Sequence, residues 1–260
     1  MADSMAELLT SAQNPKFKRL VALREKSRLR RDEGVFVVEG RRELEHCLEA
    51  GFEVETVFVC RDICHDDIAA PQVFEISKEL YAKVAYREGT EGVLAIVRSR
   101  ELRLEDLKLG SKPLIMVLEG VEKPGNLGAV LRSADAAGAD AVIVCDPLTD
   151  LWNPNLIRAS IGAVFTVPTV CCSSQEAIAW LKARGIRILT AQLQDSSAYY
   201  DCDMTGPTAI VMGTEATGLT DPWRQAADAH VLIPMLGRLD SLNVSVSAAI
   251  LLYEAVRQRQ

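Results

Sequence analysis

Three short apolar runs, each followed at once by a loop of small polar residues, constrain the fold of this chain more than any other feature. The runs are Leu114 to Leu118, Ala209 to Met212 and Val231 to Ile233. A continuous apolar strand is typical of a parallel sheet that is buried on both faces. Because parallel strands end at the same edge of a sheet, the three loops are expected to form one composite pocket.

Strand and helix signals alternate along the whole chain, and they predict an α/β protein with two domains. Residues 1–98 are expected to form a smaller N-terminal α/β domain, and the charge-rich residues 99–112 a linker. Residues 113–260 are expected to form a parallel sheet with right-handed crossovers. A length of 260 residues is sufficient for two hydrophobic cores.

The composition predicts a soluble cytoplasmic protein. Apolar residues make up 48% and charged residues 25% of the chain, which is ordinary for a globular protein. No run of about 18 apolar residues occurs, so no membrane partner is expected. The N-terminus lacks an apolar segment of signal-peptide length. The seven cysteines, an odd number, favour reduced thiols in the cytosol.

A metal site is a weak alternative. Cys60, Cys64 and His65 are close enough in sequence to suggest zinc ligands. A structural zinc site needs four ligands, and no second half of such a motif occurs elsewhere in the chain. The sequence therefore predicts no metal cofactor.

Positive charge is concentrated near the N-terminus although the whole chain carries a net charge of −7. Residues 14–31 contain one acidic residue, Glu25, and eight basic residues, which gives +7 for this segment and −14 for the rest: Lys16, Lys18, Arg19, Arg24, Lys26, Arg28, Arg30 and Arg31. The segment is expected to form one helix that ends before Gly34. Its charges suit either an ordinary solvated helix face or an electrostatic footprint for phosphates.

The first polar loop, residues 119–132, combines a strand end, a glycine-rich turn and a helix. Its glycines at 120, 125 and 128 do not match the spacing of a dinucleotide-binding fingerprint. Asp146 lies 18 residues after Gly128, close to where a ribose-binding acid would fall, so a nicotinamide-dependent dehydrogenase stays an alternative. Arg132 is expected near the first turn of the helix, where the helix dipole disfavours a cation. A surface arginine is the simpler interpretation of Arg132 taken alone.

The other two loops contain residues suited to holding a flat polar ligand. Gly213 directly follows a strand and would let a ligand approach the backbone closely. The third loop runs from Ile233 to Ser245, and its Ser and Asn residues are good helix N-caps that also bind polar ligands.

Together the three loops closely resemble the signature of the SpoU/TrmH family of RNA ribose 2′-O-methyltransferases, within the SPOUT class. The matching residues lie within 114–257, in the family's order: Asn126, Gly128 and Arg132, then Gly213-Thr214-Glu215 and Gly218-Leu219, then Ile233-Pro234-Met235 and Ser241-Leu242-Asn243-Val244-Ser245. The departure is Ala216-Thr217, where small or basic residues such as Gly-Lys are common. Residues 13–40 resemble the start of the substrate-binding domain that many members carry.

The resemblance implies a fold and a cofactor. The C-terminal domain would be a SPOUT-type parallel sheet with helices on both faces and a deep C-terminal trefoil knot. S-adenosylmethionine would bind at the knot. Its expected contacts are Gly213, Thr214, Ile233, Met235, Leu242 and Val244. Family members are usually homodimers, with each active site completed across the interface.

The resemblance also implies the reaction and its residues. A ribose 2′-hydroxyl would take the methyl group. The expected catalytic residues are Asn126, Arg132, Glu215, Ser241 and Asn243. RNA would contact the eight basic residues of the segment 14–31 and also Arg41. Ribosomal RNA is the expected substrate because of the added N-terminal domain, and transfer RNA is the alternative. A different class of protein, an RNA-binding protein that has lost catalysis on the same scaffold, also stays open.

Overall fold

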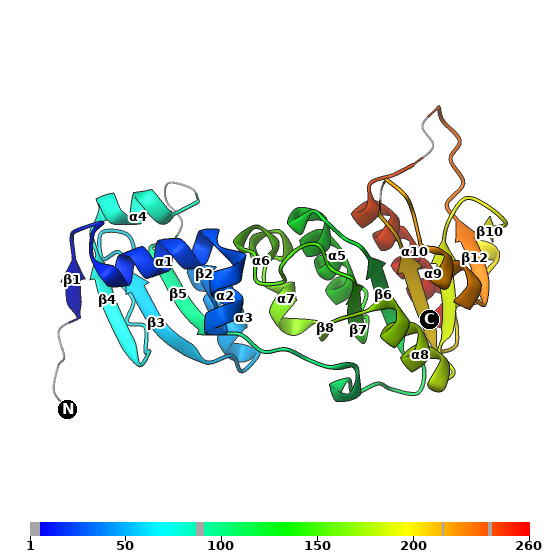
Figure 1. Cartoon of the computed structure of the whole chain (residues 1–260), viewed down its shortest axis with the longest axis horizontal. Coiled ribbons are helices and arrows are strands. Elements are labelled where there is room, and N and C mark those ends of the chain that lie inside the picture. Colours follow the sequence, from blue (N-terminus) through cyan, green and yellow to red (C-terminus); the bar gives the residue numbers. More distant parts are fainter. Residues whose placement is uncertain (1–5, 87–90, 215, 239–240) are drawn as a thin grey trace. The chain divides into compact units, whose positions relative to one another are not determined.

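A computed structural model describes residues 6–86, 91–214, 216–238 and 241–260 (Figure 1). The chain forms two compact units. The first contains the residues up to 100 together with 151–158, and the second contains 101–150 and 159–260. Each unit is built around its own sheet.

The first unit has a five-stranded mixed sheet in the order β1-β4-β3-β5-β2. Strands β1, β4 and β3 pair in parallel, whereas β5 is antiparallel to both β3 and β2. The strands are β1 (Glu7–Leu9), β2 (Val35–Glu39), β3 (Val54–Val59), β4 (Gln72–Ile76) and β5 (Val93–Arg98). The helices are α1 (Pro15–Glu25), α2 (Ser27–Glu33), α3 (Arg41–Glu49) and α4 (Lys78–Val84).

The basic segment is not the single helix that the sequence predicted. The chain leaves the helical conformation at Lys26, which ends α1 and begins α2 with φ −107° and ψ 104°. The side chain of Arg30 folds back over the break, and its Nη1 donates to the carbonyl oxygens of Leu23 (2.7 Å) and Arg24 (3.0 Å). Carbonyl groups at a helix end lack partners within the helix, so this guanidinium stabilises the break. Gly34, with φ 63°, ends α2 as predicted.

The second unit has a seven-stranded sheet in the order β10-β12-β9-β11-β6-β7-β8, and every pair is parallel. The predicted parallel α/β fold is therefore confirmed. The strands are β6 (Leu114–Glu119), β7 (Ala141–Cys145), β8 (Thr169–Cys172), β9 (Arg187–Ala191), β10 (Ser197–Ala198), β11 (Thr208–Met212) and β12 (Ala229–Leu232). The helices are α5 (Pro124–Ala136), α7 (Ala163–Thr166), α8 (Ser174–Ala183), α9 (Asp221–Ala226) and α10 (Val244–Arg259). Helix α6 (Pro154–Ser160) begins in the first unit, which contains residues 151–158.

Helix packing explains why the central strand β6 is apolar from Leu114 to Leu118. All six residues of β6 are buried. Ile115 and Val117 belong to a core cluster that includes Trp180 of α8 and Trp223 of α9. Helices α5 and α10 pack on each other and also contact the sheet, α5 at β7 and α10 at β6 and β11. A strand in this position must be apolar on both sides.

Most of the predicted linker belongs to the second unit. A short 3₁₀-helix, Leu104–Asp106, buries Leu104 in the same core cluster, and Leu102 bridges to Val170 of β8. Residues 99–112 were predicted to be a linker because their many charged residues obscure the apolar pattern of these leucines. The segment 151–158 was predicted to belong to the C-terminal domain, but it packs in the first unit. There the ring of Trp152 stacks on the ring of Phe36, with 4.3 Å between the two ring centroids.

Candidate functional site

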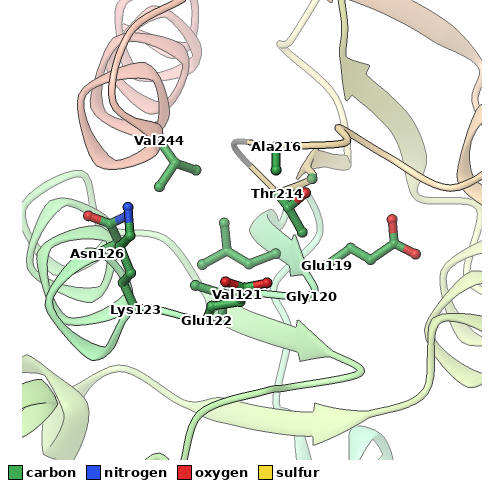
Figure 2. A pocket seen from close by; sticks show the side chains of 11 residues that line it. Glu119, Gly120, Val121, Glu122, Lys123, Asn126, Thr214, Ala216 and Val244 are labelled. Carbon is green, nitrogen blue, oxygen red and sulfur yellow. The ribbon is translucent and has the colours of Figure 1, made fainter.

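A cleft lies at the carboxyl edge of the second sheet, where β6 and β11 end and α10 begins. Figure 2 shows Asn126 and Val244 on one side of it and Thr214 and Ala216 on the other. The cavity volume is about 130 Å³. The lining residues are Leu118, Glu119, Gly120, Val121, Glu122, Lys123, Asn126, Gly213, Thr214, Ala216 and Val244. The three loops thus meet, and four of the predicted site residues, Asn126, Gly213, Thr214 and Val244, border one cleft.

Two predicted catalytic residues from distant parts of the chain touch. The Nδ2 of Asn243 donates to Oδ1 of Asn126 at 3.2 Å, across 117 residues of sequence. Asn243 is also the N-cap of α10, since its Oδ1 accepts from the backbone nitrogen (2.9 Å) and hydroxyl (2.6 Å) of Ser245. The N-cap preference of asparagine predicted this second role from the sequence. One side chain therefore caps a helix and holds a neighbouring site residue.

The loop after β11 is folded tightly on itself. A Cβ at Gly213 would overlap the backbone carbon and oxygen of Gly218, so no other residue fits there. The amide of Gly218 donates to the carbonyl of Thr214 at 3.0 Å. The Oγ1 of Thr214 also accepts from the amide of Thr217 at 3.0 Å. The unusual Thr217 thus contributes to the loop's own structure.

Glu119 is a site residue whose importance sequence reasoning missed. It is the last residue of β6, only 6% exposed, and its carboxylate accepts two hydrogen bonds from Thr220. The signal that could have identified it in the sequence is an acidic residue directly after the apolar run from Leu114 to Leu118. A charge in such a position must be paired, because burial of an unpaired charge is costly.

Two paired cysteines, Cys145 and Cys172, lie next to the cleft lining. The carbonyl of Cys145 accepts from the amide of Gly120 at 2.9 Å. Cys145 is paired in register with Cys172 of β8. A hydrogen bond between the two thiols raises the pKa of Cys145 and lowers that of Cys172. Cys145 is therefore an uncharged thiol at neutral pH, which suits its position beside acidic residues.

Other predicted site residues are not in the lining of this cleft. Ile233, Met235, Ser241 and Leu242 lie on the loop between β12 and α10 but outside the lining set. The predicted catalytic residue Glu215 lies outside the described residues.

The expected position of Arg132 near the first turn of its helix is wrong. It is the ninth residue of α5, roughly 12 Å along the helix axis from Pro124. Its side chain is exposed and does not line the cleft. The sequence predicted a helix that begins at Ala129, but α5 begins five residues earlier, at Pro124, so Arg132 lies more than two turns from its start.

The predicted RNA-binding residues divide into two groups. Five of them are engaged within the protein. Arg30 is 2% exposed, Lys16 pairs with Glu7 (2.6 Å), Arg19 with Glu33 (2.8 Å) and Glu55 (2.6 Å), Arg24 with Glu39 (3.0 Å), and Arg41 with Glu45 (2.8 Å) and Asp66. Burial lowers the pKa of Arg24. The other four are exposed. The side chain of Arg28 is 88% exposed, and its Nε lies 3.5 Å from Oδ2 of Asp32. Lys18, Lys26 and Arg31 are exposed and have no ion-pair partner among the described residues.

Within the described ranges, no three His, Cys, Asp or Glu side chains are grouped so that they could hold a metal ion. No helix in that same part of the chain is long and apolar enough to cross a bilayer.

Comparison with known proteins matches both parts of the chain. The SpoU rRNA Methylase family model matches residues 113–253, and the MRM3-like substrate binding domain matches residues 14–95. The 23S rRNA (uridine(2479)-2′-O)-methyltransferase of Streptomyces viridochromogenes is 32% identical, with 96% of this chain and 92% of the relative covered.

Two solved structures share the fold over nearly the whole length. A crystal structure of an RNA 2′-O ribose methyltransferase is 40% identical, with a TM-score of 0.85 and with 97% of this chain and 99% of that one covered. The AdoMet-bound rRNA methyltransferase of Sinorhizobium meliloti is 29% identical, with a TM-score of 0.89 and coverage of 97% and 98%. The resemblance carried by the three motifs is confirmed, and the chain belongs to the SpoU rRNA methylase family.

Proposed function

We propose that this protein transfers a methyl group from S-adenosylmethionine to a ribose 2′-hydroxyl of ribosomal RNA in the cytoplasm. The observation that carries the proposal is the meeting of the three motif loops at one cleft, with Asn243 bonded to Asn126 beside the compact loop of Gly213. The relatives named above from Streptomyces viridochromogenes and Sinorhizobium meliloti are rRNA methyltransferases. All seven cysteines are free thiols, in keeping with a reducing compartment.

The cleft has the chemistry that an adenosine group needs. Leu118, Val121 and Val244 give it apolar walls, and the glycines at 120 and 213 leave backbone exposed for hydrogen bonds. Thr214 adds a hydroxyl. We propose that Ile233, Met235 and Leu242 complete the cofactor contacts, and that this C-terminal region forms a deep trefoil knot. When bound, S-adenosylmethionine supplies a methyl group on a positively charged sulfur.

Arg132 acts on the RNA from a second copy of the chain in this proposal. Its side chain is exposed and lies outside the cleft of its own chain. A homodimer with a two-fold axis would bring it to the partner's cleft. A guanidinium stays protonated in proteins and is a poor base. Arg132 therefore binds the phosphate beside the target ribose and polarises the hydroxyl, whose proton passes to water, while Asn126, Glu215, Ser241 and Asn243 orient the two groups. The bond from sulfur to the methyl carbon would break as the O–C bond forms, which would leave S-adenosylhomocysteine.

The N-terminal unit contributes the RNA-binding surface. Four cations of the basic segment remain available to phosphates, namely Lys18, Lys26, Arg28 and Arg31. Arg30 is left out because its guanidinium is buried and bonded to backbone carbonyls. Lys16, Arg19, Arg24 and Arg41 contribute less, since nearby carboxylates already neutralise them.

The substitution Arg132→Ala tests the reaction. We expect methyl transfer to ribosomal RNA to fall at least about 100-fold, because a group that polarises the nucleophile is lost. S-adenosylmethionine binding, measured by calorimetry, stays within about twofold of the wild type. Incorporation of tritiated methyl groups measures the transfer, and Arg184→Ala, on helix α8's C-terminal side, is the control. Full activity of Arg132→Ala would contradict the assignment. A wild type that binds no S-adenosylmethionine would instead support a binding protein without catalysis.

A further inference from the structure

Glu119 clamps the far end of the loop that begins at Gly213. Its Oε2 accepts from the backbone amide of Thr220 at 2.8 Å, and its Oε1 accepts from the hydroxyl of the same threonine at 2.6 Å. Hydrogen bonds to a carboxylate are stronger than those between neutral groups. The two partners are separated by 101 residues in sequence. This contact therefore joins the end of β6 to the segment that follows the glycine-rich loop.

The clamp determines where the loop can lie. Thr220 is the N-cap residue of α9, but its hydroxyl makes no cap bond and points to Glu119 instead. Strands β6 and β11 are paired up to Leu118 and Met212, and Glu119, the next residue of β6, is still paired with Cys145 of β7. The loop is thus fixed at both ends, by the strand pairing of Met212 just before Gly213 and by the bonds from Thr220 to Glu119. Figure 2 shows the Glu119 carboxylate directed away from Asn126, on the side of Thr214 and Ala216.

A second carboxylate in the same network provides an internal comparison. The hydroxyl of Ser174 is 2.6 Å from Oδ2 of Asp146 and 3.1 Å from Oε1 of Glu119, and it accepts from Nε1 of Trp223 at 3.0 Å. Asp146 therefore shares the Ser174 contact with Glu119. Glu119, and not Asp146, bonds to Thr220.

We propose that Glu119 is a positioning residue that sets the affinity for the methyl donor by holding Gly213, Thr214 and Ala216 against the cleft. This inference rests on the proposed function. Glu119 does not contact the reacting atoms in this proposal. Loss of the clamp therefore weakens binding of S-adenosylmethionine and leaves the rate of the methyl-transfer step nearly unchanged. Thr214 and Ala216, which border the cleft, are the loop residues that transmit the effect.

The substitution Glu119→Gln tests the clamp with little change in shape. The amide retains one oxygen acceptor and replaces the other with a donor, which would face the amide or the hydroxyl of Thr220. We expect the dissociation constant and the KM for S-adenosylmethionine to rise about tenfold, since 1.4 kcal/mol corresponds to a factor of about ten. We expect kcat at saturating S-adenosylmethionine to stay within about twofold. Calorimetry and the tritiated-methyl assay, both on the full-length protein, measure these quantities.

Asp146→Asn is the matched control, because it disturbs Ser174 in the same network but leaves the clamp in place. Its dissociation constant for S-adenosylmethionine should stay within about twofold of the wild type. An equal loss of affinity in the two variants would overturn the proposal, as would an unchanged affinity in Glu119→Gln or a fall in kcat without a rise in KM.

Thr220→Val covers the case in which Glu119→Gln does not fold. It removes only the hydroxyl partner and retains the backbone bond, so a rise of about threefold in the dissociation constant is expected, and unchanged affinity would contradict the proposal. In every arm the wild type must bind S-adenosylmethionine and methylate RNA. Failure of the wild type would count against the proposed function, and failure confined to the variants would count against the clamp alone.

Discussion

Gly213 illustrates how a single position without a side chain can determine the geometry of a site. The sequence indicated a glycine directly after a buried strand, and the structure adds the reason that no side chain fits. The added Cβ would occupy the space of the Gly218 backbone, which cannot move as a flexible side chain can. The result is a compact loop whose backbone borders the cleft.

The substitution Gly213→Ala is expected to displace this loop. Overpacking of this kind costs about 1–3 kcal/mol. If the loop moves off the cleft to relieve this cost, the affinity for S-adenosylmethionine should fall about 5- to 140-fold. Gly206→Ala is the control, because a Cβ there would meet nothing within 4 Å. Calorimetry measures the affinity, and thermal unfolding shows whether the fold persists. Wild-type affinity in Gly213→Ala would mean that the loop does not bound the cofactor site.

At the scale of elements, the basic segment shows how far charge counting leads and where it fails. The count of +7 was correct for the sequence, yet carboxylates from β1, α2, β2 and β3 neutralise much of it in the folded unit. The break at Lys26 also turns Arg30 inward. What remains for RNA is a smaller set of exposed cations on α1 and α2.

This division predicts different salt dependence for two double variants. Lys26→Gln with Arg31→Gln removes two exposed cations, so the slope of log K against log salt for RNA binding should fall by about two. Arg19→Gln with Arg41→Gln removes two paired cations, and it should leave the slope nearly unchanged while lowering the melting temperature. Filter binding of a ribosomal RNA fragment at several salt concentrations gives the slopes. Equal slopes for the two variants would contradict the proposed RNA-binding surface.

The elements themselves were largely predictable from the sequence. The strands after residues 113, 207 and 228 begin and end within about two residues of their predicted bounds, because uninterrupted apolar runs between polar loops leave few alternatives. The short strands β1 and β10 were not predicted, since two or three residues at a sheet edge carry too little pattern. The linker was also misjudged, because four leucines among charged residues have no regular period.

At the scale of the whole molecule, the exposed position of Arg132 leads to a test of the homodimer. Arg132→Ala lacks the residue given to the partner, and Gly213→Ala has a displaced cofactor loop, so each variant alone should have low activity when S-adenosylmethionine is limiting. In a mixed dimer, one of the two sites would have both parts intact. Equal mixing with random exchange should therefore restore about a quarter of the wild-type activity. The tritiated-methyl assay after mixing measures this recovery, and no recovery in verified mixed dimers would show that Arg132 acts within its own chain.

The sequence by itself determined the family, the parallel α/β sheet and the residues of the three motifs, because strand burial and loop chemistry depend on residues close together in the chain. Only the tertiary structure decided which of these residues meet. The bonds from Asn243 to Asn126 and from Glu119 to Thr220 each span more than 100 residues, and no local pattern encodes them. The buried position of Arg30 and the outward position of Arg132 likewise depend on packing around each helix, which follows from the elements that surround it rather than from its own sequence.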